Sequence, residues 1–86
     1  MNKKEARTFE KKVLTECKID PNSSTLIEPN SGDTLSTGYK VQIKAVMQNE
    51  CRLRLKEITK KNNLAVKEED NQIIIYKPKQ TNLSLK

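Results

Sequence analysis

The chain has 86 residues, of which 34% are apolar and 3% are aromatic, which is enough for one small domain with a modest core and too little for a large interior cleft. Its 17 Lys and Arg side chains outnumber its 11 Asp and Glu side chains and give a net charge of +6. This surplus of positive charge favours an anionic partner.

The first predicted element is a helix over residues 3–18. Its apolar positions recur at spacings of three and four residues, as on one face of a helix: Ala6, Phe9, Val13 and Cys17. Asn2 and Glu5 resemble a capping box, which would satisfy free amides at the helix start. The other face is basic and is partly balanced by three glutamates; its cations are Lys4, Arg7, Lys11, Lys12 and Lys18.

Strand signals follow this helix. Residues 19–38 contain no Lys or Arg and many turn residues, and the apolar run 25–27 within them predicts a short strand. Over residues 39–47 apolar and polar side chains alternate, which predicts a longer strand with one buried face. Lys40 and Lys44 fall on its polar face, so we expect them to reach solvent.

A second helix is predicted over residues 50–62. Four residues fall within about 60° of one another on a helical wheel and define its packed face: Cys51, Leu55, Ile58 and Asn62. Arg52, Lys56 and Lys60 share an exposed face at spacings of four residues, and such a stripe can follow phosphates. Leu53 lies among these cations, which places an apolar side chain in a basic patch, as at a surface that contacts a partner.

The last predicted element is a β-hairpin formed by residues 64–66 and 72–76, which Pro78 ends. We therefore expect an α+β fold with two helices packed on a small, mainly antiparallel sheet, in the order helix, strand, strand, helix, hairpin. Residues 1–78 are expected to form a single domain, and residues 79–86 a polar C-terminal tail.

Catalytic and cofactor chemistry is not indicated. The absence of histidine removes the usual base near neutral pH and the catalytic triads built on it, so we expect no enzyme. The 2 cysteines and 2 glycines form no metal or nucleotide motif, so we expect no metal and no cofactor. Cys17 and Cys51 are interpreted as reduced packing residues. The chain shows no apolar segment long enough for a membrane span or a signal sequence, which predicts a cytoplasmic or nuclear location and no membrane partner.

Two stretches, residues 52–64 and 72–78, together resemble the Arg-x-x-x-His family of single-stranded nucleic-acid-binding domains. Members of this family place an arginine and a histidine one helical turn apart and continue into a strand that ends in basic residues. Arg52 matches the arginine, whereas Lys56 stands in place of the histidine. The resemblance implies that Arg52 and Lys56 contact phosphate or base and that Lys60 extends the surface.

The function expected from these patterns is non-catalytic binding of DNA or RNA through a basic surface on the strand and helix of residues 40–61. The residues expected to contact nucleic acid are Lys40, Lys44, Arg52, Lys56, Lys60 and Lys61. The alternative is a small adaptor or inhibitor, of the kind that mobile elements or phages encode. It would use the basic helix and Leu53, as a partner contact, to dock on an acidic protein surface.

Overall fold

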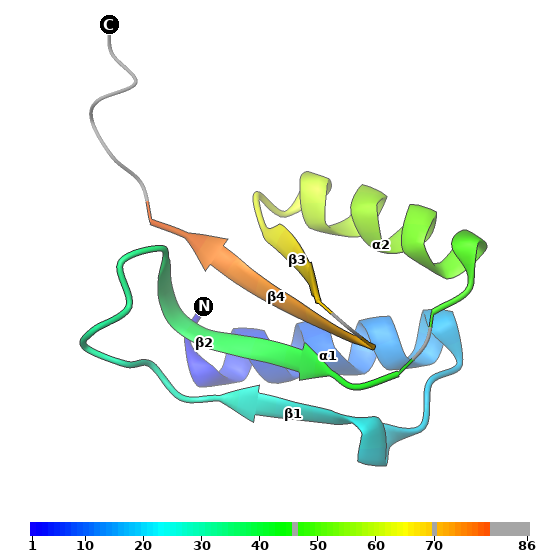
Figure 1. The fold of residues 1–86 in the computed structure, drawn as a ribbon, viewed down its shortest axis with the longest axis horizontal. Coiled ribbons are helices and arrows are strands. Elements are labelled where there is room, and N and C mark those ends of the chain that lie inside the picture. Colours follow the sequence, from blue (N-terminus) through cyan, green and yellow to red (C-terminus); the bar gives the residue numbers. More distant parts are fainter. Residues whose placement is uncertain (46, 70, 80–86) are drawn as a thin grey trace, which may run out of the picture.

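The computed structural model describes residues 1–45, 47–69 and 71–79 and shows two α-helices against a four-stranded sheet (Figure 1). In chain order the elements are α1 (Lys3–Cys17), the 3₁₀ helix η1 (Pro21–Ser23), β1 (Ser24–Ile27), β2 (Ser36–Ile43), α2 (Asn49–Lys61), β3 (Ala65–Glu69) and β4 (Gln72–Pro78). The predicted α+β class, with its order of helix, strand, strand, helix and hairpin, is confirmed.

The sheet has the strand order β1-β2-β4-β3, and every neighbouring pair is antiparallel. Because β4 pairs with both β2 and β3, those two strands run parallel to each other, and α2 connects them across β4. This arrangement is a split β-α-β unit. α1 packs against β1 and β2, while α2 packs against β3 and α1, so both helices lie on one side of the sheet.

One buried cluster joins the helices to this side of the sheet. Its members are Ala6, Phe9 and Val13 of α1, Leu55 and Ile58 of α2, Val41 and Ile43 of β2, Ile73 and Ile75 of β4, and Met47 before α2. Side chains alternate between the two faces of a strand. Gln42 and Ile74, which pair in register, therefore lie on the opposite face, against which no described helix packs.

β2 differs from the strand predicted over residues 39–47, because it begins at Ser36 and ends at Ile43. Ile43 pairs with Ser24, the first residue of β1, and with Ile73, the second residue of β4. β1 begins at this register and β4 extends only one residue past it, to Gln72. The Lys44 amide still donates to the carbonyl oxygen of Ser23 at 2.7 Å, and the strand ends there. Met47 nevertheless packs in the core and is only 7% exposed.

The helix ends lie within one residue of the predicted ends, and the packed face of α2 matches the predicted one except at Asn62. The predicted capping box of α1 is present, with the Glu5 amide donating to Asn2 Oδ1 at 2.8 Å and the Asn2 amide donating to Glu5 Oε1 at 3.0 Å. α2 begins one residue early, after Gln48, which makes no side-chain capping bond. Asn62 is exposed rather than packed, and Thr59, which is 4% exposed, lies on the buried face.

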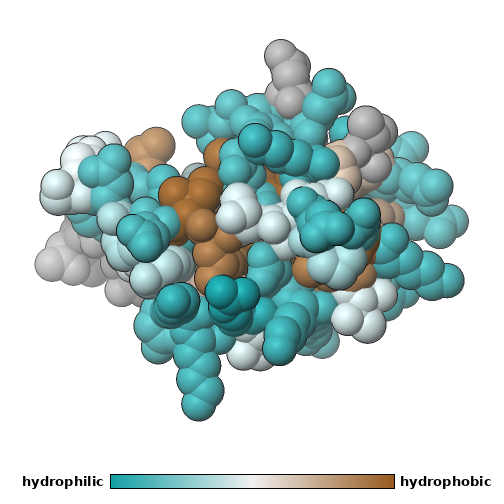
Figure 2. Space-filling model, turned by 90° about the horizontal axis from the view of Figure 1, so that it is seen from below, coloured by the Kyte–Doolittle hydropathy of each residue, from teal (hydrophilic) through white to brown (hydrophobic). Residues whose placement is uncertain are grey.

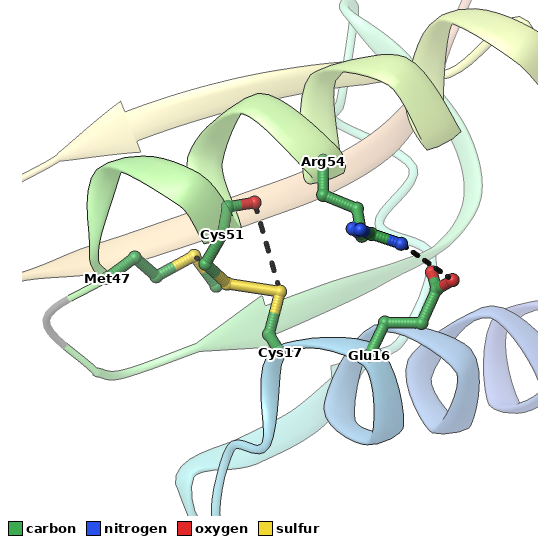
Figure 3. Close-up of a disulfide and its surroundings, with 5 residues drawn as sticks. All are labelled: Glu16, Cys17, Met47, Cys51 and Arg54. Carbon is green, nitrogen blue, oxygen red and sulfur yellow. Dashed lines mark hydrogen bonds and ion pairs between the residues drawn. A yellow bond between two sulfur atoms is a disulfide. The ribbon is translucent and has the colours of Figure 1, made fainter.

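Cys17 and Cys51 form a disulfide that joins the end of α1 to the first turn of α2 (Figure 3). The interpretation of these residues as reduced cysteines is therefore wrong, although both do lie partly buried against the core. The Cα atoms are 5.4 Å apart, a usual separation for a disulfide. The sequence gives no sign of this proximity, since the residues are separated by 34 positions and meet only because the helices pack together.

Two leucines of α2 provide a matched test of helix packing. Leu55 is 1% exposed, whereas Leu53 is 63% exposed. Leu55→Ala is expected to lower the free energy of unfolding by about 2–5 kcal/mol, through lost burial and a cavity, and Leu53→Ala by less than about 0.5 kcal/mol. Chemical denaturation measures both changes, and equal midpoints for the two variants would contradict the observed packing of α2.

Replacing both cysteines by serine tests the contribution of the disulfide. The bond spans a sequence separation of 34 residues, and restricting an unfolded loop of that length stabilises the folded state by about 3–4 kcal/mol. The free energy of unfolding of the double variant is expected to fall by this amount, and the reduced wild-type protein should unfold at a similar denaturant concentration. A double variant as stable as the oxidised wild type would show that the bond does not stabilise the fold.

Candidate nucleic-acid interface

The two helices carry the net positive charge of the chain. α1 with its C-terminal cap Lys18 holds six Lys and Arg and three Glu, and α2 holds five Lys and Arg and two Glu. Each helix thus contributes +3, so the rest of the sequence sums to zero against a total of +6. Because both helices lie on one side of the sheet, the surplus is concentrated on that side of the molecule (Figure 1).

The three glutamates of α1 are engaged in contacts that leave its outer face basic. Glu5 accepts a hydrogen bond in the capping box, and Glu10 is 8% exposed and accepts the hydroxyl of Ser24 in β1. Glu16 lies 3.8 Å from Arg54 of α2. The exposed cations of the outer face form no ion pair with other described residues; they are Lys4, Arg7, Lys11, Lys12 and Lys18.

On α2 the structure leaves three of the predicted contact residues free of ion pairs. Lys56, Lys60 and Lys61 are exposed and pair with no carboxylate among the described residues. Arg52 is also exposed, but its Nε lies 3.9 Å from a carboxylate oxygen of Glu68 in β3. The helix therefore presents lysines that are available to an anion beside two arginines, Arg52 and Arg54, that already have carboxylate partners.

Lys40 and Lys44 lie apart from the cations of the helices. Val41 and Ile43 are fully buried beneath the helices, so Lys40 projects from the opposite face of β2. Lys44 continues the same alternation just after the strand and is exposed. The six residues predicted to contact nucleic acid thus do not form one continuous surface, because four lie on α2 and two lie across the sheet.

Lys40 is also held by Asp33, which organises the loop between β1 and β2. The two side chains approach to 2.6 Å, and Asp33 also accepts the amides of Leu35 and Ser36 and the Ser36 hydroxyl. Lys40 makes the largest contribution to lowering the pKa of Asp33 well below its usual range, followed by the Ser36 hydroxyl and the two amides. Asp33 is therefore ionised at neutral pH and neutralises Lys40.

Asp33→Asn tests this ion pair through the pH dependence of stability. A carboxylate whose pKa is lower in the folded than in the unfolded state stabilises the fold above the unfolded pKa, and this stabilisation is lost as the pH falls towards the folded pKa. Wild-type protein is expected to be more stable than the variant at neutral pH, and the difference should shrink as the pH falls below about 4. Denaturation midpoints across this range measure it, and a difference independent of pH would contradict the assignment.

A surface hollow brings cations of α1 close to a cation of β4, which the sequence did not indicate. It lies between the N-terminal half of α1 and the turn from α2 to β3, with Phe9 and Leu64 among its lining residues. Lys4 and Lys12 of α1 and Lys77 of β4 also line it. The sequence analysis placed the α1 cations on one basic face but left them out of the predicted interface. The signal that could have included them is that the outward side of this helix contains no glutamate.

Leu53 and Leu35 are the large apolar side chains that lie most exposed among the described residues, at 63% and 67%. Leu53 lies on the solvent side of α2, where the sequence predicted a partner contact.

The face seen from the β1 side of the molecule is mostly hydrophilic, and its apolar surface is limited to small patches (Figure 2). That face therefore offers no broad apolar docking surface.

No group of three or more His, Cys, Asp or Glu side chains in the described part of the chain could hold a metal ion. Within residues 1–45, 47–69 and 71–79, no helix is both long and apolar enough to cross a membrane.

A scan against protein-family models, a search of curated proteins and a search of solved structures gave no match. The candidate interface is therefore defined by the positions and charges of its own residues.

Proposed function

We propose that this protein binds nucleic acid without catalysis, through the outer faces of α1 and α2. The observation that supports the proposal is the position of the surplus charge, because the two helices on one side of the sheet account for the whole net charge of +6. Nucleic-acid phosphates are attracted to such a surface, and the release of their condensed counterions adds affinity.

The spacing of the α1 cations suits contact with a phosphate backbone. Lys4, Lys11 and Lys18 are seven residues apart, which is about 10 Å along a helix axis, and Arg7 lies between the first two. Lysines bind phosphate as flexible point charges and carry no base preference. The interface therefore favours binding that tolerates many sequences and accepts either DNA or RNA.

The resemblance to the Arg-x-x-x-His family supports a narrower form of the proposal, in which Arg52 and Lys56 contact a single strand. Arg52 must then exchange its 3.9 Å contact with Glu68 for a phosphate or base. Arg52→Lys keeps the charge but loses the planar fork that allows bidentate or stacking contacts. Loss of binding in this variant favours the narrower form, whereas a purely electrostatic contact tolerates the substitution.

The proposed location is the cytoplasm or the nucleus, where nucleic acid is abundant. Disulfides are rare in those compartments. The structure contains the Cys17–Cys51 disulfide, so binding should be measured with Cys17 and Cys51 both oxidised and reduced.

Three double variants that each remove two positive charges test the proposed interface. Lys4→Gln with Lys11→Gln alters α1, Lys56→Gln with Lys60→Gln alters α2, and Lys44→Gln with Lys67→Gln is the matched control outside the helices. For the wild type, the logarithm of affinity should fall with the logarithm of salt concentration with a slope of about −2 to −4, as for three to five phosphate contacts. Each helix variant should make that slope less negative by about 1–2 and weaken DNA and RNA binding alike.

Fluorescence anisotropy with labelled single-stranded and duplex oligonucleotides at several salt concentrations provides the measurement. The control variant is expected to keep most of the wild-type affinity. No salt-dependent binding at low micromolar protein would overturn the proposal. An equal loss in all three variants would show that net charge, rather than the helical face, determines binding.

The exposure of Leu53 supports a second candidate function, an adaptor or inhibitor that docks on an acidic protein surface. Leu53 is 63% exposed on the helix that also presents Lys56 and Lys60. Leu53→Ser separates the two candidates because it keeps the charge of the helix. Nucleic-acid binding should survive this substitution, whereas cross-linking to an acidic protein partner should be lost.

A further inference from the structure

The two sulfurs of the disulfide lie at helix ends of opposite polarity. Cys17 is the last residue of α1, and Cys51 is the third residue of α2. A helix N-terminus stabilises a nearby negative charge, and a helix C-terminus disfavours it. In addition, the Gln48 side chain makes no capping bond at the start of α2, so no side chain of the cap residue competes for the first-turn amides. The helix ends therefore favour a thiolate at Cys51 over one at Cys17.

The contacts of the two sulfurs favour the same difference (Figure 3). Cys17 Sγ lies 3.8 Å from the carbonyl oxygen of Cys51, to which a Cys17 thiol can donate its proton. Cys51 Sγ lies 3.7 Å from Met47 Sδ, a weaker acceptor than a carbonyl oxygen. In the reduced protein the proton is thus held more firmly by Cys17 than by Cys51.

The disulfide is accessible from solvent, since both cysteines are only partly buried and line a surface groove between α1 and α2. The charged groups that line this groove come from both helices: Glu16, Lys18, Glu50, Arg54 and Glu57. Glu16 and Arg54 pair with each other at 3.8 Å. Of the remaining charges, Lys18 directly follows Cys17 and Glu50 directly precedes Cys51, and both oppose a more stable thiolate at Cys51. The difference between the sulfurs therefore depends on the helix ends and on their own contacts.

We propose that the Cys17–Cys51 disulfide exchanges with small-molecule thiols such as glutathione. In this reaction Cys51 is the leaving sulfur, and in the reverse direction it is the sulfur that resolves the mixed disulfide. An external thiolate attacks Cys17 Sγ, the S–S bond breaks, and its electron pair leaves on Cys51 as the thiolate. A second external thiolate then attacks the external sulfur of the mixed disulfide, and the Cys17 thiolate that leaves takes a proton from water. Two external thiols are oxidised to one disulfide, and the protein gains two electrons as a dithiol. This inference does not depend on nucleic-acid binding.

The position of the mixed disulfide tests the proposal in the unmodified chain. The oxidised protein is incubated with reduced glutathione without denaturant, the reaction is quenched with acid, and tryptic peptides are analysed by mass spectrometry. Cys17 and Cys51 fall in separate peptides, residues 13–18 and 45–52. Glutathione is expected mainly on Cys17, because the sulfur that ionises more readily leaves. Glutathione mainly or equally on Cys51, or a disulfide that does not react, would overturn the proposal.

Single-cysteine variants give an independent measurement of the same difference. The rate of alkylation by iodoacetamide, followed against pH, reports the pKa of Cys51 in Cys17→Ser and of Cys17 in Cys51→Ser. The pKa of Cys51 is expected to be lower by about one unit or more, so that about ten times as much of it is thiolate near neutral pH. The difference should disappear in denaturant, where the helix ends are lost. Equal values in the folded variants, or a lower value for Cys17, would contradict the assignment.

Discussion

Packing of both helices on one face of an antiparallel sheet is the constraint on which the rest of this structure depends. Each helix buries one narrow apolar stripe, represented by Phe9 and Val13 in α1 and by Leu55 and Ile58 in α2, against aliphatic residues of β2 and β4. The other helix positions must face water. This chain fills many of them with lysine and arginine, so the packing that builds the core also determines where the positive charge is displayed.

The Cys17–Cys51 disulfide holds this two-layer arrangement at one end. A domain of 86 residues has a small core, and a covalent link between elements is a common way to stabilise a chain of this size. The Glu16–Arg54 contact joins the same ends of the two helices (Figure 3). At the other end of α1 no such link is present among the described residues, and the lysine-lined hollow lies there instead.

Local periodicity predicted the elements and most of the core, because burial on one side of a helix or strand leaves a direct pattern in the sequence. It gave the buried face of α2 through Leu55 and Ile58, for example. It could not give the end of β2, which depends on where β1 and β4 begin, or the disulfide, which depends on helix packing. Local patterns also placed the predicted interface on residues 40–61 alone. They could not show that Glu10 is engaged by Ser24, which leaves the outer face of α1 basic, or that Lys40 is paired with Asp33, because both are tertiary contacts.

The two sides of the sheet differ in how their lysines are paired with carboxylates. Away from the helices, Lys40 lies 2.6 Å from Asp33 and Lys67 lies 3.7 Å from Glu69, so these two cations are compensated locally, and Lys44 is exposed without an ion pair among the described residues. The outer lysines of α1 and α2 have no such partners among the described residues. Screening in physiological salt acts over about 8 Å, close to the distance of about 10 Å that separates packed layers. A polyanion therefore responds mainly to the side that it approaches, and attraction by unpaired charge is expected on the helical side.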